Sequence, residues 1–319
     1  MRELIIQKND AGQRLDKFLT KAVRGMPMSM MYKSIRTKKI KVNRKRAEPD
    51  MKLSVGDTVQ LFIREEFFGA PSNDKGALSR ITPKLDIVYE DENILLLNKR
   101  PGVLVHEDTA GNENTLIMHI LAYLSQKGEY NPLSEQSFAP ALCNRIDRNT
   151  GGIVIAAKNA EALREMNDLI KNGGTHKFYL CAVHGIPKKS FDRLICWLKK
   201  DSDSNTVSVT DKKVNGSKEC ITDYRIISKK NDCSLLEVGL ITGRTHQIRA
   251  QFSHIGHPLV GDGKYGINRA DRAKGYKYQA LYAYRLGFTV DDGKLLSYLN
   301  GKEFTIDQNK IWFVGDFFN

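Results

Sequence analysis

Residues 144–152 read NRIDRNTGG and run directly into the apolar strand IVIAA at residues 153–157. A short polar loop that enters a buried strand is typical of a cleft edge, because loops held by a rigid scaffold often carry function. Asp147 lies between Arg145 and Arg148, whose charges can hold its carboxylate ionised where water is scarce. The alternative is an ordinary turn in which the aspartate bonds its own backbone.

Similar apolar runs along the chain predict its fold class. Further strands are expected at residues 93–98, 177–184 and 235–241. Leu163, Met166 and Ile170 recur with the 3.6-residue period of a helix, which is expected to end at Gly173 and Gly174. Strands and helices do not alternate in a βαβ rhythm, so the larger part of the chain is expected to be α+β.

A second polar segment, TGRTHQIRAQFSHIGHP, occupies residues 242–258. Thr245 is in position to cap a helix there, because its hydroxyl can accept a free backbone N–H group. Ile248 and Ile255 lie on the apolar face of this expected helix, which is predicted to stop at Gly256.

The same helix is expected to carry a polar face. His246, Arg249 and Ser253 fall at positions i, i+3 and i+7. Arg244 precedes the helix N-terminus, where unpaired backbone N–H groups favour a phosphate. The alternative is an ordinary amphipathic helix with solvated cations.

The composition indicates a polyanionic partner. The chain has 319 residues, a net charge of +13, a pI of about 9.4 and a mean hydropathy of −0.42, as in globular proteins that bind nucleic acid. Residues 14–52 hold 13 Lys or Arg and 3 Asp or Glu, so one short region carries most of the excess.

This basic region is expected to fold as a compact unit. The apolar period predicts a helix over residues 15–23, and Ser29 is expected to cap a second helix that reaches Ile35. Strands are predicted at residues 40–42 and 58–63.

The pattern dissolves after this unit, which predicts the domain boundaries. Residues 65–83 have the composition of a linker. The expected organisation is a basic module at residues 1–64, a linker at 65–83 and a large domain at 84–319.

Membrane and secreted proteins are disfavoured. No run approaches 18 apolar residues, and the first eight residues do not resemble a secretion signal, so a cytoplasmic location is expected. The five cysteines include no C-x-x-C pair, which argues against disulfide scaffolds and structural zinc.

Cofactor sites are also disfavoured. GDGKYG at residues 261–266 matches a dinucleotide motif letter for letter, but no apolar helix follows it. His246, His254 and His257 have no Cys or acid at ligand spacing, so no metal is expected.

Taken together, the motifs resemble those of the RluA-type family of ribosomal large-subunit pseudouridine synthases, most closely its RluC and RluD branch. Residues 10–57 resemble an RNA-binding module first described in a small-subunit ribosomal protein. Residues 144–152 resemble the family's HRLDxxTSG motif and residues 177–185 its KxYxAxVxG strand. Residues 242–249 resemble TGRTHQIR, and residues 256–262 the GHPIxGD segment that follows it.

The resemblance implies an isomerase that converts uridine to pseudouridine in ribosomal RNA, without a cofactor. It implies a mixed, largely antiparallel central sheet flanked by helices and loops, plus a small N-terminal α/β RNA-binding module. It also implies that Asp147 is the catalytic aspartate, that Tyr179 lies against the target base, and that Arg145 fills the space left by the flipped base.

The remaining site residues are assigned from their chemistry. Arg249 is the candidate to pair with Asp147, and Ile248 is expected to close an apolar wall beside the uracil. Arg244 is expected to bind a backbone phosphate. The cations expected to grip structured RNA are Arg14, Lys17, Arg36, Lys39, Lys41, Arg44 and Lys45. No membrane or obligate protein partner is expected, and the chain is predicted to be a monomer.

Four positions depart from the family pattern. Asn144 and Tyr282 stand where the family usually has His, Gly151 stands where it has Ser, and Lys38 replaces a glycine of the basic module.

The expected reaction breaks the bond from N1 of uracil to C1′, turns the base and joins C5 to C1′. No atom is gained or lost, so one carboxylate can serve, either by trapping C1′ covalently or by removing the 2′ proton to leave a glycal. Two other interpretations stay open: a non-catalytic RNA-binding or ribosome-assembly protein, and a nucleotide-cofactor enzyme that uses residues 261–266.

Overall fold

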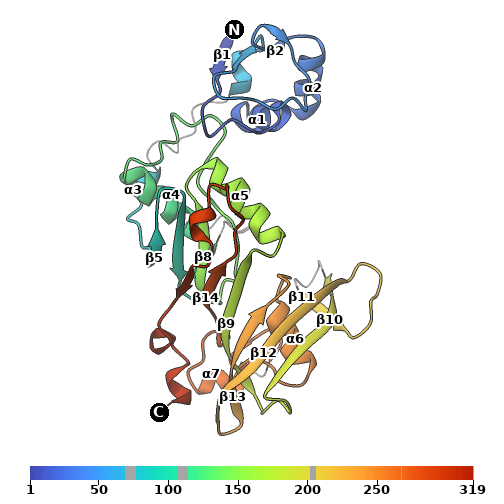
Figure 1. The fold of residues 1–319 in the computed structure, drawn as a ribbon, viewed down its shortest axis with the longest axis vertical. Helices are drawn as coiled ribbons and strands as arrows, with labels where there is room; N and C mark the ends of the chain where they lie inside the picture. The colour runs from blue at the N-terminus through green and yellow to red at the C-terminus, as the bar shows by residue number, and fades with distance from the viewer. Residues whose placement is uncertain (69–76, 106–113, 202–205, 267, 319) are drawn as a thin grey trace.

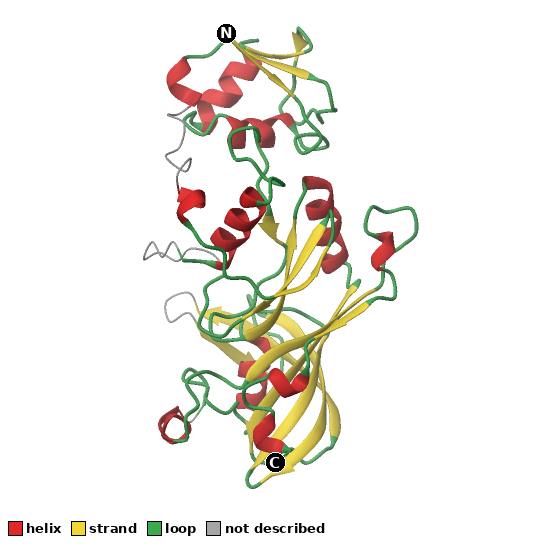
Figure 2. Ribbon diagram, turned by 90° about the vertical axis from the view of Figure 1, so that its left-hand side faces the viewer, coloured by secondary structure: helices red, strands yellow, loops and turns green. Residues whose placement is uncertain are grey.

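Two β-sheets organise the molecule. The computed structural model describes residues 1–68, 77–105, 114–201, 206–266 and 268–318. The smaller sheet and its helices lie at the N-terminal end of an elongated molecule, and the larger sheet runs through the rest (Figure 1). Figure 2 shows that the larger sheet is strongly twisted, as the handedness of the strands requires.

The N-terminal module, defined here as residues 1–68, is built on an antiparallel sheet in the order β1-β4-β2-β3. Its strands are β1 (Arg2–Ile5), β2 (Ile40–Val42), β3 (Lys45–Arg46) and β4 (Thr58–Leu61). Helices α1 (Leu15–Ala22) and α2 (Met28–Arg36) pack with this sheet around a core of its own. Phe18 and Ile40 are completely buried in this core.

One expected cap in the module is wrong. Ser29 lies inside α2, whose N-cap is Pro27 at φ −59°. Proline fixes φ near this value, so the chain enters the helix two residues before the serine. Strand β1 was not expected. Its residues are mostly exposed, and the strand forms by pairing with β4, more than fifty residues away in sequence.

The larger sheet has eleven strands among the described residues, in the order β11-β10-β12-β13-β9-β14-β8-β6-β5, with β15 beside β14 and β7 beside β8. The strands are β5 (Ile87–Glu90), β6 (Ile94–Lys99), β7 (Ala141–Leu142), β8 (Gly151–Ala157), β9 (Thr175–His184), β10 (Phe191–Asp201), β11 (Thr206–Thr210), β12 (Lys218–Lys230), β13 (Cys233–Leu240), β14 (Leu281–Phe288) and β15 (Glu303–Thr305). Among the described pairings, β14 with β8 is the parallel one. The prediction of a mixed, largely antiparallel sheet in an α+β fold is therefore confirmed.

Both faces of the sheet are covered, which explains the unbroken apolar run of β8. On one face lies α5 (Ala160–Lys171) together with the C-terminal segment; on the other lie α4 (Leu116–Gln126) and α6 (Gln247–His254). Every residue of β8 is buried. Asn159 caps α5 by accepting the N–H group of Ala162 at 2.8 Å. The short helix α7 (Asn268–Ala273) follows α6.

The segment expected to be a linker is partly structured. The 3₁₀ helix η1 (Glu65–Phe68) packs Phe67 and Phe68 against the core of the N-terminal module, so this end belongs to that unit. Helix α3 (Ala77–Arg80) packs against α4. Residues 69–76 lie outside the described part of the chain.

A polar seam joins the N-terminal module to the larger domain. Asn9 donates to Glu135 at 2.8 Å and accepts the N–H group of Ala160 at 3.2 Å, where α5 begins. Gln13 donates to Ser137 at 2.7 Å. Because these hydrogen bonds come from side chains near one edge of the module, they orient it against the start of α5. No helix in the described ranges has the length and apolar character needed to cross a bilayer.

Candidate active site

The loop between β7 and β8 carries Asp147, whose side chain is partly exposed. The Asp147 carbonyl accepts the N–H group of Thr150 at 3.0 Å, which closes a turn just before the buried strand. Arg145 and Arg148, its neighbours in sequence, make no contact with this carboxylate among the described residues. The cation that does so comes from a helix 102 residues further along.

Arg249, on the buried side of α6, bridges two carboxylates. Its NH1 donates to Oδ2 of Asp147 at 2.7 Å, while Nε and NH2 donate to the two oxygens of Asp262 at 2.7 and 2.8 Å. Asp262 is completely buried, and its Oδ1 also accepts the N–H groups of Lys264 and Tyr265. The guanidinium group of Arg249 is therefore held by Asp262 through two nitrogens, which leaves the third, NH1, directed at Asp147.

Burial and pairing act in opposite directions on these charges. Burial alone lowers the pKa of Arg249, but its bonds to Asp262 and Asp147 outweigh this and raise the pKa. Burial raises the pKa of Asp262, yet the guanidinium holds it below its ordinary value. Both groups stay charged away from water because each is bonded to the other.

Helix α6 begins differently from the expectation. Its N-cap is His246, in a left-handed conformation at φ 53°, and Thr245 stands one residue outside. Arg249 is buried rather than on a solvated polar face, and Ile255 is exposed beyond the helix end. The local period is right, but the sheet decides which side of the helix is covered, and that side is the one with Arg249.

An apolar wall lies beside the carboxylate. Tyr179 on β9 and Ile248 on α6 are buried in one cluster that also includes Ile146, the residue before Asp147. Burial raises the pKa of Tyr179, and the nearby charge of Asp147 adds to this effect. The phenol therefore stays neutral, as an aromatic surface for a base requires.

The two outer arginines differ in their surroundings. Arg145 is exposed, and its side chain has no hydrogen bond or ion pair to another described residue. Arg244 is also exposed, but its Nε donates to the carbonyl of Glu219 at 3.2 Å, which fixes the side chain beside β12. Both guanidinium groups are accessible from solvent.

Sequence reasoning missed Lys99, a buried lysine beneath the loop. Its ammonium donates to three backbone carbonyls: Arg100 at 3.1 Å, Val103 at 3.1 Å and Arg148 at 2.8 Å. Burial lowers the pKa of Lys99 to about 7, although the charge of Asp147 opposes this. The sequence signal for it is a lysine at the end of an apolar strand.

Two departures from the family pattern touch each other. A Cβ atom at Gly151 would lie 2.3 Å from Cε2 of Tyr282, so no larger residue fits at position 151 beside this tyrosine. The Tyr282 hydroxyl donates to Asn98 at 2.7 Å. Asn144 accepts the N–H group of Ile155 at 2.7 Å, so its side chain fastens the start of the loop to β8. At the fourth departure, Lys38 has φ 62°, the region that favours the usual glycine.

The stretch at residues 261–266 folds as a turn that carries Asp262 and Tyr265, not as the start of a nucleotide-binding helix. Its Asp262 anchors Arg249, so the segment belongs to the site for a reason that its glycines do not indicate. Within the described ranges, no three His, Cys, Asp or Glu side chains gather in a way that could hold a metal ion.

The cations of the N-terminal module are mostly exposed. The exposed ones among those predicted to bind RNA are Arg14, Lys17, Arg36, Lys39, Arg44 and Lys45, and Lys41 is half-buried. Arg14 is bonded through Nε and NH2 to buried Asp16 at 3.1 and 2.9 Å, so its charge is already partly neutralised. Lys41 lies 5.6 Å from the centre of the Phe62 ring.

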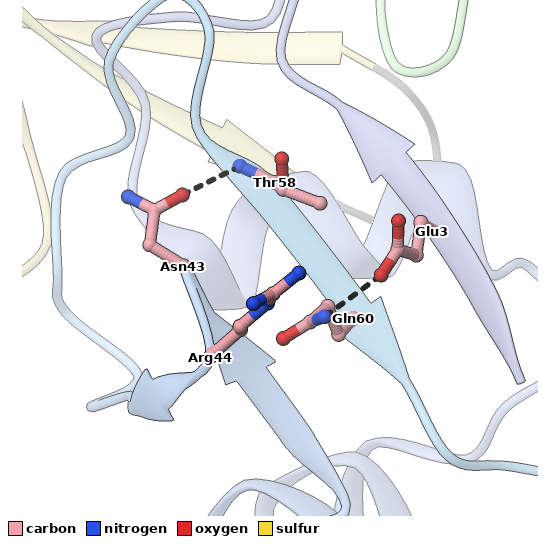
Figure 3. A pocket seen from close by; sticks show the side chains of 5 residues that line it. All are labelled: Glu3, Asn43, Arg44, Thr58 and Gln60. Atoms are coloured by element: carbon pink, nitrogen blue, oxygen red, sulfur yellow. Dashed lines mark hydrogen bonds between the residues drawn. The ribbon is translucent and has the colours of Figure 1, made fainter.

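A hollow of about 310 Å³ lies on the face of the small sheet away from its helices (Figure 3). Arg44 reaches across β4 toward Gln60, which donates to Glu3 at 2.7 Å. Asn43 accepts the N–H group of Thr58 at 2.8 Å. The hollow holds one cation and one carboxylate, so it does not by itself favour a phosphate.

Comparisons with known proteins agree with one another. Residues 93–254 match the family model of RNA pseudouridylate synthases, a range that includes Asp147, Tyr179 and Arg249. The chain is 33% identical over 293 residues to an uncharacterised RNA pseudouridine synthase of Mycoplasma genitalium, covering 90% of this chain and 88% of the relative. It is 31% identical to ribosomal large subunit pseudouridine synthase C of Escherichia coli, covering 89% and 87%. The fold is similar to human RNA pseudouridylate synthase domain containing 1, with a TM-score of 0.54 and 22% identity over 74% of this chain and 97% of that one.

Proposed function

The chain belongs to the RNA pseudouridylate synthase family, and from this premise we propose that it isomerises uridine to pseudouridine in the RNA of the large ribosomal subunit, with Asp147 as its catalytic group. The observation that carries the assignment of Asp147 is the fixed fork of Arg249, which meets this carboxylate at 2.7 Å beside the apolar surface of Tyr179 and Ile248. The relatives named as large-subunit enzymes support the choice of RNA.

In the proposed mechanism the target uridine leaves its stack and its uracil lies on Tyr179. Arg249 holds Oδ2 of Asp147, so Oδ1 is the oxygen free to act on the sugar. Either it bonds C1′ as the N1–C1′ bond breaks, or it takes the 2′ proton. The detached uracil is retained, turns, and joins C1′ through C5, as the bond from Asp147 to C1′ breaks in the first route or the 2′ proton returns to the sugar in the second. C5 then loses its hydrogen to solvent and N1 takes up a proton, so the product is an isomer of the substrate.

The outer cations are proposed to position the RNA. Arg145 is exposed beside Asp147 and is proposed to occupy the space that the flipped base vacates. Arg244 is proposed to bind a phosphate beside the start of α6. The N-terminal module, at residues 1–68, is proposed to grip structured RNA through its exposed lysines and arginines, and residues 84–319 are proposed to form the catalytic domain. We further propose that the protein acts as a monomer in the cytoplasm.

The test uses unmodified large-subunit RNA transcribed with tritium at C5 of uridine. Because C5 loses its hydrogen when it joins C1′, the wild-type protein is expected to release tritium into water. Asp147→Asn is expected to lower the rate more than about a thousandfold, since an amide cannot replace the carboxylate. Asp211→Asn, at an exposed carboxylate, is the matched control.

RNA binding is measured in parallel. An Asp147→Asn protein that binds the transcript as the wild type does, yet releases no tritium, supports the enzyme. A wild-type protein that binds the transcript without releasing tritium would indicate a non-catalytic assembly factor instead.

A further inference from the structure

His246 and Tyr265 lie in two of the sequence motifs, at residues 242–249 and 261–266, but the proposed mechanism gives neither residue a role. The His246 ring lies between a tyrosine and the catalytic carboxylate: Nδ1 is 2.9 Å from the Tyr265 hydroxyl, and Nε2 is 3.9 Å from Oδ1 of Asp147. The two rings meet edge to face with centroids 5.6 Å apart. The left-handed backbone of His246 costs free energy, so these contacts have to maintain it.

The protons on this pair can be assigned. The backbone N–H of Val207 in β11 donates to the Tyr265 hydroxyl oxygen at 2.9 Å. A hydroxyl has a single proton to give, and within the described ranges His246 Nδ1 is the acceptor in reach of it. Tyr265 therefore donates to Nδ1, and the neutral imidazole carries its own proton on Nε2, which faces Asp147.

The charge state of the ring fits a neutral donor. Burial lowers the pKa of His246 and, with the positive charges of Arg249 and Lys264, outweighs the opposing carboxylates of Asp147 and Asp262. A neutral N–H group can orient a carboxylate oxygen without cancelling its charge, whereas an imidazolium would pair with it. At 3.9 Å the contact is too long for a hydrogen bond, so Oδ1 is faced but not occupied.

Tyr265 is itself fixed to the arginine side of the site. Its backbone N–H donates to Asp262 at 3.2 Å, its carbonyl accepts the Ser253 hydroxyl at 2.8 Å, and its ring lies 5.3 Å from the guanidinium of Arg249. Tyr265 therefore contacts both Arg249 and His246, the two residues that face the oxygens of Asp147.

We propose that His246 is a positioning residue for Asp147, held by Tyr265 in the tautomer that turns an N–H group toward Oδ1. Arg249 fixes one carboxylate oxygen, and His246 aims the other at the sugar. This inference deepens the proposed function and rests on it.

Two variants of His246 separate the two ends of the ring. In His246→Gln the side-chain amide can still place an N–H group near the position of Nε2, facing Asp147. In His246→Asn the shorter amide can still accept from Tyr265 but leaves nothing opposite Oδ1. The full-length protein is assayed by tritium release under single turnover, and KM is measured alongside.

His246→Asn is expected to lower the single-turnover rate by about tenfold to a hundredfold with KM within about twofold, as a misplaced catalytic group does. His246→Gln is expected to stay within about threefold of the wild type. Tyr265→Phe is expected to lower the rate of the wild type but to add little in the His246→Asn background, because both act through the same ring.

Several outcomes overturn the inference. Equal losses in the Asn and Gln variants would mean that the N–H group is not what matters, and an unchanged rate in His246→Asn would mean that the ring does not position Asp147. If His246→Asn does not fold, additive losses in His246→Gln combined with Tyr265→Phe would also contradict it. In each of these cases an inactive Asp147→Asn protein leaves the proposed function standing, whereas an active one removes both.

Discussion

The N-terminal module and the site around Asp147 use charge in opposite ways. In the N-terminal module the cations are many and exposed, and those of the β2–β3 region meet few carboxylates. Around Asp147 the charges are few, and Arg249 and Asp262 are buried and bonded to each other. Exposed charges act by their summed field, which salt screens, whereas buried charges act through position. Substitutions should therefore have large, local effects at the site and small, cumulative effects in the module.

The sharpest test of this contrast is removal of the buried cation. Arg249→Met leaves two carboxylates without their partner, so the free energy of unfolding is expected to fall by about 3–5 kcal/mol, and tritium release to fall with it. Arg145→Met, which removes an exposed arginine from the loop that carries Asp147, is expected to leave the unfolding free energy almost unchanged. Equal losses of stability in the two variants would break the comparison. Thermal unfolding of both proteins decides it.

The same variant has an expected pH dependence. In the wild type the pKa of Asp262 is below its unfolded value, so the stabilisation is present at neutral pH and is lost as the pH falls through the lowered pKa. Without Arg249, burial raises that pKa above the unfolded value. The variant then gains a proton on folding, so its deficit in melting temperature should shrink as the pH is lowered from about 7 to about 5.

Packing at the site gives the next largest effect. Gly151→Ser places a Cβ atom 2.3 Å from the Tyr282 ring and is expected to cost about 1–3 kcal/mol of unfolding free energy. Combined with Tyr282→His, which provides a smaller ring, the serine should cost less than it does alone. Gly243→Ser, where a Cβ atom meets nothing within 4 Å, is the control. Purely additive values for positions 151 and 282 would contradict the predicted clash.

The cations of the N-terminal module should show a weaker and salt-dependent effect. Changing Lys39, Lys41 and Lys45 together to Gln is expected to weaken binding of large-subunit RNA by about tenfold and to flatten its salt dependence by two to three units of log–log slope, roughly one for each lost phosphate contact. The matched control changes three exposed lysines of the larger domain, Lys188, Lys229 and Lys294, to Gln. Filter binding between about 50 and 300 mM salt measures both. If the control variant binds RNA as weakly as the test variant, the N-terminal module is not the RNA-binding part of the protein.

The smallest predicted effect is a gain. Lys38 has φ 62°, so Lys38→Gly is expected to stabilise the protein by about 0.5–1 kcal/mol in urea unfolding. Lys39→Gly, one residue later and outside the left-handed region, should be neutral or destabilising. A loss of stability in Lys38→Gly would show that the lysine side chain contributes more than its backbone costs.

What the sequence could predict was mostly local. The period of Leu163, Met166 and Ile170 predicts α5 well, because residues three and four apart in sequence share one face of a helix. The run at residues 153–157 likewise predicts β8. The helix starts were harder to predict. Helices α2 and α6 are capped by Pro27 and His246, whose backbone conformation sets the boundary without a hydrogen bond from the side chain.

The site was predicted in part, for a related reason. Asp147 stands out because of its loop, and Arg249 because of its motif, and the two do lie in contact. That Asp262 holds Arg249, and that Lys99 lies beneath the loop, depends on how β6, β8 and α6 come together. The spacing of residues in the sequence does not predict these contacts, because they form only when the elements pack together. The arginines beside Asp147 in sequence were the obvious partners, and they make no contact with it among the described residues.

The close fit of Gly151 against Tyr282 also has a historical consequence. If an ancestor carried the serine and histidine usual in the family, the order of the two exchanges was constrained. Enlarging position 282 first would have driven a ring into the serine, whereas losing the serine first would have left only a small gap that a tyrosine could later fill. Relatives with serine at position 151 should therefore lack tyrosine at position 282. A relative with glycine at 151 and histidine at 282 would represent the intermediate step.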